Sequence, residues 1–157
     1  ALQLAQAFAA IADDGRLRSP TLVMGADNPP ASVLDPVLAR QVADMLVTVT
    51  GPVGTGKQAR VPNYRVSGKT GTSRKSGKGG YQERRYIASF AGCAPASDPR
   101  IAAVVVVNDP SEGEYYGGAV AAPLFSSVMS GALRLLNVPP DDAPLLQTQL
   151  RDEEGPA

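Results

Sequence analysis

The sequence of 157 residues predicts an α/β chain of the α+β kind, with three main helices and three sheet strands. Two observations point to this class. Apolar residues recur at helical spacing in three segments, and three other segments have the composition of strands. In addition, the segment "IAAVVVV" is apolar on both faces, so it needs cover above and below the sheet.

The helices are predicted from their apolar spacing and their end signals. The first lies in "ALQLAQAFAAIADDG" and ends at Gly15, a suitable residue for a helix C-terminus. Asp35 is predicted to cap the second helix, with Pro36 at its first position, and Gly51 ends it. The third helix is predicted from about residue 118 to 137.

The strands are predicted at 63–73, 84–94 and 100–109, with the Gly/Lys-rich connection "RKSGKGGYQE" between the first two. The second strand can pair with one edge of the third, but no other segment offers a partner for its second edge. Because the first helix also has no N-cap, we expect the chain to be the C-terminal portion of a larger domain, at residues 1–138. Residues 139–157, Pro-rich and then acidic, are predicted to form a poorly ordered tail.

The composition narrows the possible chemistry. Fifteen basic and fifteen acidic residues cancel, so no overall field attracts nucleic acid, and no nucleic-acid partner is expected. The chain contains no histidine, which excludes Ser-His-Asp and Cys-His catalysis and most zinc sites. The single cysteine, Cys93, is predicted to be a small buried hydrophobe. No metal and no cofactor is therefore expected.

Two Gly-Lys pairs raise functional hypotheses, and the first is a possible phosphate-binding loop. Gly51 and Gly56-Lys57 have the spacing of a P-loop. Position 58 is glutamine, so the hydroxyl that would hold Mg²⁺ is missing, and Pro62 interrupts the segment that should begin a helix. The sequence favours a mobile glycine loop here, and a nucleotide-binding module stays a distant alternative.

The second pair begins the segment Lys69-Thr70-Gly71-Thr72, which lies on a predicted strand. Glycines at positions 68 and 71 let another backbone approach and pair with the strand by β-augmentation. A lysine with two hydroxyls suits the binding of a carboxylate. Strict alternation, however, places Thr70 and Thr72 on one face of the strand and Lys69 on the other. Without a family context, Lys69 reads as a solvated charge on an edge strand.

Lys-Thr-Gly is also the third element of the active-serine penicillin-binding and β-lactamase family. The Gly/Lys-rich connection, the segment "SFAGCAPASDPRIAAVVVV", the "NDP" turn and the closing amphipathic helix follow it in the order of that family. From Leu2 to about Pro140, the sequence resembles the C-terminal half of the transpeptidase domain of a class B penicillin-binding protein, most closely the division-specific penicillin-binding protein 3 type. The resemblance implies an antiparallel sheet flanked by helices.

The resemblance implies a peptidoglycan D,D-transpeptidase of cell division, which binds stem peptides ending in D-Ala-D-Ala and is inhibited by β-lactams. In this family, a serine in Ser-x-x-Lys forms an acyl-enzyme, and a second motif is Ser-x-Asn; neither pattern occurs in the 157 residues. The chain alone is therefore expected to be inactive, and the remainder of the same domain is an expected partner. Other division proteins are further expected partners. The expected location is the periplasmic side of the bacterial inner membrane, held by an N-terminal anchor outside this chain.

The resemblance also implies roles for individual residues. Lys69 and Thr72 are the expected catalytic residues, with the backbone N–H of Thr72 forming half of the oxyanion hole. The expected substrate- and β-lactam-binding residues are Thr70, Gly71, Ser73, Arg74, Tyr81, Tyr86, Tyr115 and Tyr116. The tyrosines are expected to form an aromatic wall around the ligand, although aromatic residues also occur simply because they bury area. Arg74 is either a carboxylate ligand or a solvated loop charge.

A serine β-lactamase or D,D-carboxypeptidase is the close alternative to the transpeptidase. These enzymes share the fold and the Lys-Thr-Gly motif, but pass the acyl group to water. The residues Lys69–Thr72 do not separate the alternatives.

Overall fold

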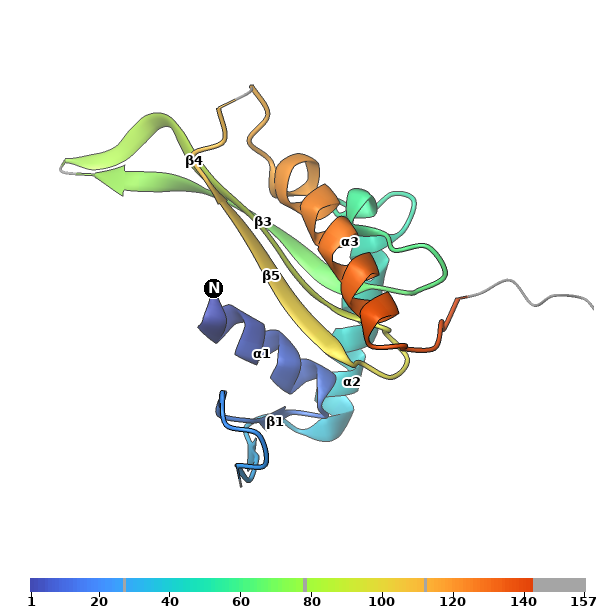
Figure 1. The fold of residues 1–157 in the computed structure, drawn as a ribbon. Helices are drawn as coiled ribbons and strands as arrows, with labels where there is room; N and C mark the ends of the chain where they lie inside the picture. The colour runs from blue at the N-terminus through green and yellow to red at the C-terminus, as the bar shows by residue number, and fades with distance from the viewer. Residues whose placement is uncertain (27, 78, 112, 143–157) are drawn as a thin grey trace, which may run out of the picture.

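The computed structural model describes residues 1–26, 28–77, 79–111 and 113–142, and its centre is a three-stranded antiparallel sheet. The strand order is β3-β4-β5, so β4 is the central strand (Figure 1). The strands are β3 (Ser67–Gly77), β4 (Gly80–Ala94) and β5 (Ile101–Asn108). Two short strands, β1 (Arg16–Leu17) and β2 (Ala31–Ser32), pair with each other apart from this sheet. The predicted antiparallel sheet of three strands is confirmed.

Three helices surround the sheet: α1 (Leu2–Ala12), α2 (Pro36–Val47) and α3 (Gly117–Leu135). Helices α1 and α3 lie on opposite faces of the sheet, as Figure 1 shows. Helix α3 is long and apolar enough to cross a membrane by length and composition. Because Phe125, Met129 and Leu133 on it are fully buried, α3 is instead the core helix of this fold.

The predicted start of α2 is confirmed, whereas α1 ends at Ala12, before the predicted end at Gly15. Asp35 caps α2, since its carboxylate accepts hydrogen bonds from the backbone N–H of Val37 at 2.9 Å and of Leu38 at 3.2 Å. Helix α2 passes into a 3₁₀ turn at Thr48–Thr50, so "MLVTVT" ends a helix and forms no strand. Gly15 follows α1 with φ +80°, a backbone conformation that glycine adopts without strain.

The core divides into two clusters because β4 alternates between the faces of the sheet. On the α3 side, the rings of Phe90 and Phe125 lie 4.7 Å apart within the larger cluster. On the α1 side, Phe8, Ala91 and Cys93 form a smaller cluster. Cys93 is buried as predicted, and burial raises the pKa of its thiol to about 12.

Phe90 fills the space that three glycines leave open. A Cβ atom would lie 2.7 Å from the Phe90 ring if added at Gly56, 2.6 Å if added at Gly68, and 3.1 Å if added at Gly92. These glycines belong to three segments: the loop after α2, strand β3 and strand β4 itself. Their missing side chains therefore let the loop and β3 pack directly against this ring.

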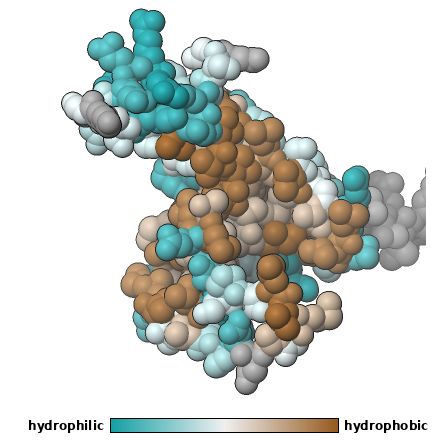
Figure 2. All heavy atoms as spheres, turned by 60° about the vertical axis from the view of Figure 1, so that its left-hand side comes forward, coloured by the Kyte–Doolittle hydropathy of each residue, from teal (hydrophilic) through white to brown (hydrophobic). Residues whose placement is uncertain are grey.

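Strand β5 pairs with β4 along its whole length, from Ile101 opposite Ala94 to Asn108 opposite Ile87. Within the described residues, no strand pairs with its other edge, as the sequence predicts. Val106 on β5 is 46% exposed and Leu2 on α1 is 62% exposed. Figure 2 shows the apolar surface on this side of the molecule, below a hydrophilic projection.

That projection is a hairpin arm, because the first two strands continue beyond their predicted bounds at 73 and 84. Strand β3 begins at Ser67, later than predicted, and both strands continue through "RKSGKGGYQE" to Gly77 and Gly80. Gly79 and Gly80 have φ +103° and +129°, which permits a tight reversal after so short a loop. The basic and polar side chains of the arm are largely exposed, so its composition resembles that of a loop although its backbone is paired.

The beginning of the predicted tail is attached to the body of the chain. The Asp141 carboxylate accepts hydrogen bonds from the backbone N–H of Arg65 at 2.8 Å and from the Ser97 hydroxyl at 2.9 Å. Residues 139–142 are therefore anchored rather than unpacked. The rest of the predicted tail, 143–157, lies outside the described residues.

Candidate functional site

The Lys69–Thr72 segment lies on β3, at one edge of the sheet. Thr70 is paired with Phe90 and Lys69 with Ala91. Because directly paired residues share a face, Thr70 and Thr72 lie on the α3 face, whereas Lys69 starts on the α1 face. The alternation expected from the sequence is thus present.

The length of the Lys69 side chain brings its charge back to the threonine. Its Nζ donates a hydrogen bond to the carbonyl oxygen of Thr70 at 3.1 Å and lies 3.5 Å from Thr70 Oγ1. The lysine and the hydroxyl therefore meet at the strand edge although their Cβ atoms point to opposite faces. The four-carbon stem of lysine provides this reach.

Both threonine hydroxyls are held by neighbouring segments. Thr70 Oγ1 lies 3.1 Å from Thr55 Oγ1, on the loop after α2. Thr72 Oγ1 accepts a hydrogen bond from the backbone N–H of Gly117 at 3.0 Å, at the start of α3. A Cβ atom on Gly117 would overlap the carbonyl oxygens of Ser89 and Gly71, so only glycine lets α3 approach β3 this closely.

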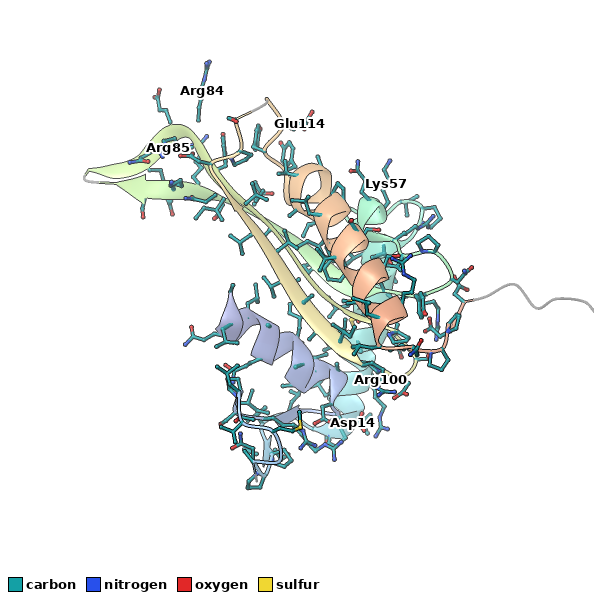
Figure 3. All side chains as sticks on the ribbon, viewed as in Figure 1. Asp14, Lys57, Arg84, Arg85, Arg100 and Glu114 are labelled. Carbon is teal, nitrogen blue, oxygen red and sulfur yellow. The ribbon has the colours of Figure 1, made fainter. Side chains whose placement is uncertain are left out.

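A cavity of about 370 Å³ lies beside these hydroxyls. The loop after α2, strand β3 and the first turn of α3 form its walls, and Figure 3 shows Lys57 on this side of the molecule. The lining contains a lysine and three threonine hydroxyls but no carboxylate. Its residues are Thr55, Lys57, Gln58, Thr70, Thr72, Tyr116, Gly117, Gly118 and Ala119.

Three of the four singled-out tyrosines come together near the motif. The rings of Tyr86 and Tyr115 stack at 4.1 Å, and those of Tyr115 and Tyr116 lie 4.5 Å apart. The hydroxyl of Tyr115 donates to that of Tyr116 at 3.3 Å, and this hydrogen bond raises the pKa of Tyr115. Tyr81 is separate: it is 75% exposed on the arm, opposite Ser76.

The remaining predicted site residues follow Thr72 along β3. Gly71 is paired with Ser89, and Ser73 with Ile87. Arg74 is paired with Tyr86, so the tyrosine stack stands at the Arg74 end of the motif strand. Tyr116 is the tyrosine that reaches the cavity.

Asp109 holds the base of the arm, a role that the sequence analysis missed. Its carboxylate accepts hydrogen bonds from Arg85 Nε at 2.7 Å and from Lys75 Nζ at 3.3 Å. Its backbone N–H donates to the carbonyl oxygen of Tyr86 at 2.9 Å. The hydrogen bond from Arg85, assisted by Lys75, lowers the pKa of Asp109. Figure 3 shows Arg85 at this junction. The "NDP" turn was the sequence signal for the position of Asp109, since aspartate tolerates the φ of +62° found there.

The Gly51–Lys57 segment does not form a P-loop. Helix α2 and a 3₁₀ turn precede it instead of a strand, and Lys57 begins another 3₁₀ turn of three residues instead of a helix. The loop is hydrogen-bonded from the N–H of Gly56 to the carbonyl of Val49 at 2.9 Å. The helix N-terminus that would bind a nucleotide phosphate is missing from this part of the structure.

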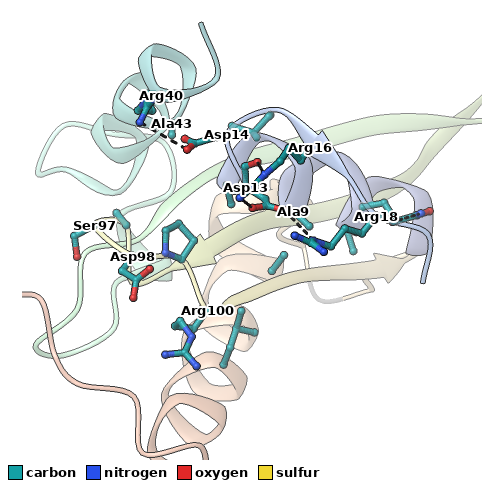
Figure 4. Close-up of a pocket in the computed structure, with 18 of the residues that line it drawn as sticks. Ala9, Asp13, Asp14, Arg16, Arg18, Arg40, Ala43, Ser97, Asp98 and Arg100 are labelled. Carbon is teal, nitrogen blue, oxygen red and sulfur yellow. Dashed lines mark hydrogen bonds and ion pairs between the residues drawn. The ribbon is translucent and has the colours of Figure 1, made fainter. Parts of the chain in front are cut away.

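A larger hollow of about 900 Å³ lies between α1, α2 and the turn from β4 to β5 (Figure 4). Its charged residues pair mainly with one another. The Asp13 carboxylate accepts hydrogen bonds from Arg16 and Arg18, and Asp14 lies 3.7 Å from Arg40. The hollow contains none of the predicted site residues.

The arrangement around β3 can bind and polarise an extended peptide. An edge strand offers backbone hydrogen bonds to a peptide that adds alongside it. The Lys69 ammonium and the threonine hydroxyls lie at that strand, and they are suitable donors for a carboxylate or a developing oxyanion. These groups can therefore bind an extended peptide that ends in a carboxylate.

Comparison with known proteins identifies the family. The family described as "Penicillin binding protein transpeptidase domain" matches residues 1–130. The chain therefore belongs to the penicillin-binding protein transpeptidase family, and its similarities lie with the class B, penicillin-binding protein 3 type.

Two individual relatives have names of the same family. The chain is 45% identical over 142 residues to the peptidoglycan D,D-transpeptidase FtsI of Escherichia coli K12, covering 89% of this chain and 24% of the relative. It is 43% identical over 143 residues to the probable peptidoglycan D,D-transpeptidase PbpC of Pseudomonas aeruginosa, covering 89% and 25%. The chain thus spans about a quarter of the length of these relatives.

Among solved structures, the chain resembles the apo transpeptidase domain of penicillin-binding protein 3 from Burkholderia pseudomallei. The TM-score is 0.80 at 43% sequence identity, over 90% of this chain and 44% of that one. The predicted fold is thereby confirmed.

Proposed function

We propose that the protein containing this chain is a peptidoglycan D,D-transpeptidase of cell division and a target of β-lactams. The observation that carries the proposal is the position of the Lys69 ammonium at an edge strand, 3.1 Å from the Thr70 carbonyl and beside its hydroxyl. The printed names of the E. coli and P. aeruginosa relatives support the same activity.

In the proposed reaction, a serine from polypeptide outside these residues attacks the carbonyl carbon of the penultimate D-Ala. The peptide bond breaks, the terminal D-Ala leaves with a proton on its nitrogen, and an ester links the peptide to the serine. An amine of a neighbouring stem peptide then attacks the ester. This second attack forms the cross-link, returns the serine hydroxyl and balances the protons.

Lys69 and the Thr72 backbone act on charge at the reacting centre. The Thr72 N–H donates to the oxyanion that forms in both steps, and one such donor contributes about 2.7–4 kcal/mol. The hydrogen bond from Gly117 to Thr72 fixes the strand at this point. Lys69 supplies positive charge next to the serine. Thr70, Gly71, Ser73 and Arg74 contact the extended peptide along β3, and Tyr86, Tyr115 and Tyr116 form the aromatic wall, with Tyr81 farther out on the arm.

The test is covalent labelling of the intact protein by a fluorescent penicillin. We expect Lys69→Ala to reduce the acylation rate at least a hundredfold, because the lost charge acts on the transition state, while the far-UV circular dichroism stays unchanged. Arg134→Ala is the matched control, since Arg134 is an exposed cation in the last turn of α3. Normal labelling of Lys69→Ala would remove Lys69 from the mechanism.

The lifetime of the acyl-enzyme separates the proposed activity from its close alternative. A transpeptidase keeps the penicilloyl ester for many minutes, whereas a serine β-lactamase hydrolyses it rapidly. Rapid loss of label from the wild-type protein would favour the β-lactamase. We further propose a periplasmic location and contacts with other division proteins, on the same family grounds.

A further inference from the structure

Asp109 connects three segments of the chain at the base of the arm. Its carboxylate accepts hydrogen bonds from Lys75 on β3 and Arg85 on β4, and the residue itself begins the connection from β5 to α3. We propose that Asp109 is a positioning residue that holds the stacked rings of Tyr86 and Tyr115 in place for the side chain of the bound ligand. The inference rests on the proposed function and adds to it a residue that acts through the tyrosines.

The carboxylate binds where the pairing of the two strands is irregular. The register of β3 against β4 shifts between Arg74 and Ser76, and such an irregularity removes hydrogen bonds of the ladder. Lys75 lies within it, with Nζ 3.3 Å from Asp109 Oδ2, and its side chain is only 20% exposed. On β4, Arg85 Nε donates to the same oxygen at 2.7 Å. One carboxylate therefore links β3 to β4 at the point where the ladder is interrupted.

The backbone of Asp109 contacts the strand that carries the first ring of the tyrosine stack. Its N–H donates to the carbonyl oxygen of Tyr86 at 2.9 Å, and Tyr86 is paired with Arg74. The rings of Tyr86 and Tyr115 lie 4.1 Å apart with their planes at 13°, and Tyr115 belongs to the connection that begins at Asp109. Both rings are thus carried by segments that Asp109 joins. Because these segments are already ordered, a ligand that packs on the rings loses less conformational entropy on binding.

The groups that act on the reacting carbonyl are held by other contacts. Thr72 Oγ1 accepts a hydrogen bond from the N–H of Gly117 at 3.0 Å, and Lys69 Nζ donates to the carbonyl oxygen of Thr70 at 3.1 Å. Neither contact involves Asp109. Loss of the Asp109 carboxylate should therefore weaken the binding of the ligand and leave the rate of the bond-forming step unchanged.

The test measures the acylation rate of the intact protein against the concentration of benzylpenicillin, in the wild type and in Asp109→Asn. Asparagine removes the charge, keeps the backbone N–H and tolerates the φ of +62°. We expect the dissociation constant of the complex that precedes acylation to rise about three- to thirtyfold, the effect of losing two partly exposed ion pairs. The limiting acylation rate at saturating concentration should change less than about twofold.

A second ligand and two further variants isolate the cause. 6-Aminopenicillanic acid lacks the aromatic side chain of benzylpenicillin, so its acylation rate should change less than about twofold in Asp109→Asn. Arg85→Met should reproduce part of the loss with benzylpenicillin, and the double variant should lose no more than Asp109→Asn alone, since both changes remove the same ion pair. Arg84→Met is the matched control and should behave as wild type, because Arg84 is the neighbouring exposed cation and points away from the sheet (Figure 3).

Each contrary outcome has a distinct meaning. An unchanged dissociation constant in Asp109→Asn would overturn the role of this residue. Equal losses with both compounds, or a limiting rate that falls as much as binding does, would also overturn it, because the whole domain would then be disturbed. Equal losses in Arg84→Met and Arg85→Met would make the general charge of the arm the cause and would overturn it as well. A wild-type protein that reacts with neither compound would instead refute the proposed function, and the inference with it.

Discussion

Gly117→Ala tests the close packing of helix α3 against strand β3. A Cβ atom at position 117 would overlap the carbonyl oxygens of Ser89 and Gly71 and lie 3.1 Å from the Gly71 nitrogen. These are backbone atoms of paired strands, so they cannot move aside as a flexible side chain could. Overpacking of this kind costs about 1–3 kcal/mol. Loss of the hydrogen bond from Gly117 to Thr72 adds about 0.5–1.5 kcal/mol.

The expected total is a destabilisation of about 2–4 kcal/mol, measured by urea unfolding of the intact transpeptidase domain. Gly131→Ala is the matched control, because Gly131 lies in the same helix and a Cβ atom there has no neighbour within 4 Å. This control should be stabilised by about 0.5–1 kcal/mol through helix propensity. If both variants unfolded at the wild-type urea concentration, the close packing inferred at Gly117 would be wrong.

Two further predictions concern titratable groups. Burial raises the pKa of Cys93 to about 12, so a thiol reagent at pH 8 should label the folded protein far more slowly than the urea-unfolded protein; equal rates would contradict the burial. The Arg85 hydrogen bond lowers the pKa of Asp109 below its unfolded value, so its stabilising effect is present above about pH 4 and is lost as the pH falls through the folded pKa. In Asp109→Asn, the free energy of unfolding should therefore fall less between pH 5 and pH 2 than in the wild type. An equal fall in both proteins would contradict this reasoning.

The sequence predicted the elements whose signals are local. The cap at Asp35, the glycine after α1 and the apolar faces of α2 and α3 all depend on residues within a few positions of one another. The hairpin arm was missed because its basic and glycine-rich composition resembles a loop, whereas its pairing depends on residues across the turn. Strand pairing is decided by the partner strand, which local composition does not reveal.

The candidate site was predictable only in part, for the same reason. The motif residues were found from their order along β3, and the alternation of Lys69 against Thr70 was found from strand geometry. The position of Lys57 near Thr70 depends on how the loop between α2 and β3 packs beside β3. The hydrogen bonds of Asp109 depend on Lys75 of β3 and Arg85 of β4. Such contacts between distant segments carry no periodic signal along the chain.

The Phe90 ring makes positions 56 and 90 interdependent. A larger residue at Gly56 would fit only if position 90 became smaller at the same time, because a Cβ atom there would lie 2.7 Å from the ring. At Gly68 and Gly92 a smaller residue 90 would not be enough, because a Cβ atom would also lie 2.8 Å from the carbonyl oxygen of Ala91 and 2.6 Å from that of Ser67. Sequence drift in this protein should therefore change positions 56 and 90 jointly and keep glycine at positions 68 and 92. A homologue with alanine at position 68 and an unaltered phenylalanine at position 90 would have its Lys-Thr-Gly segment displaced outward.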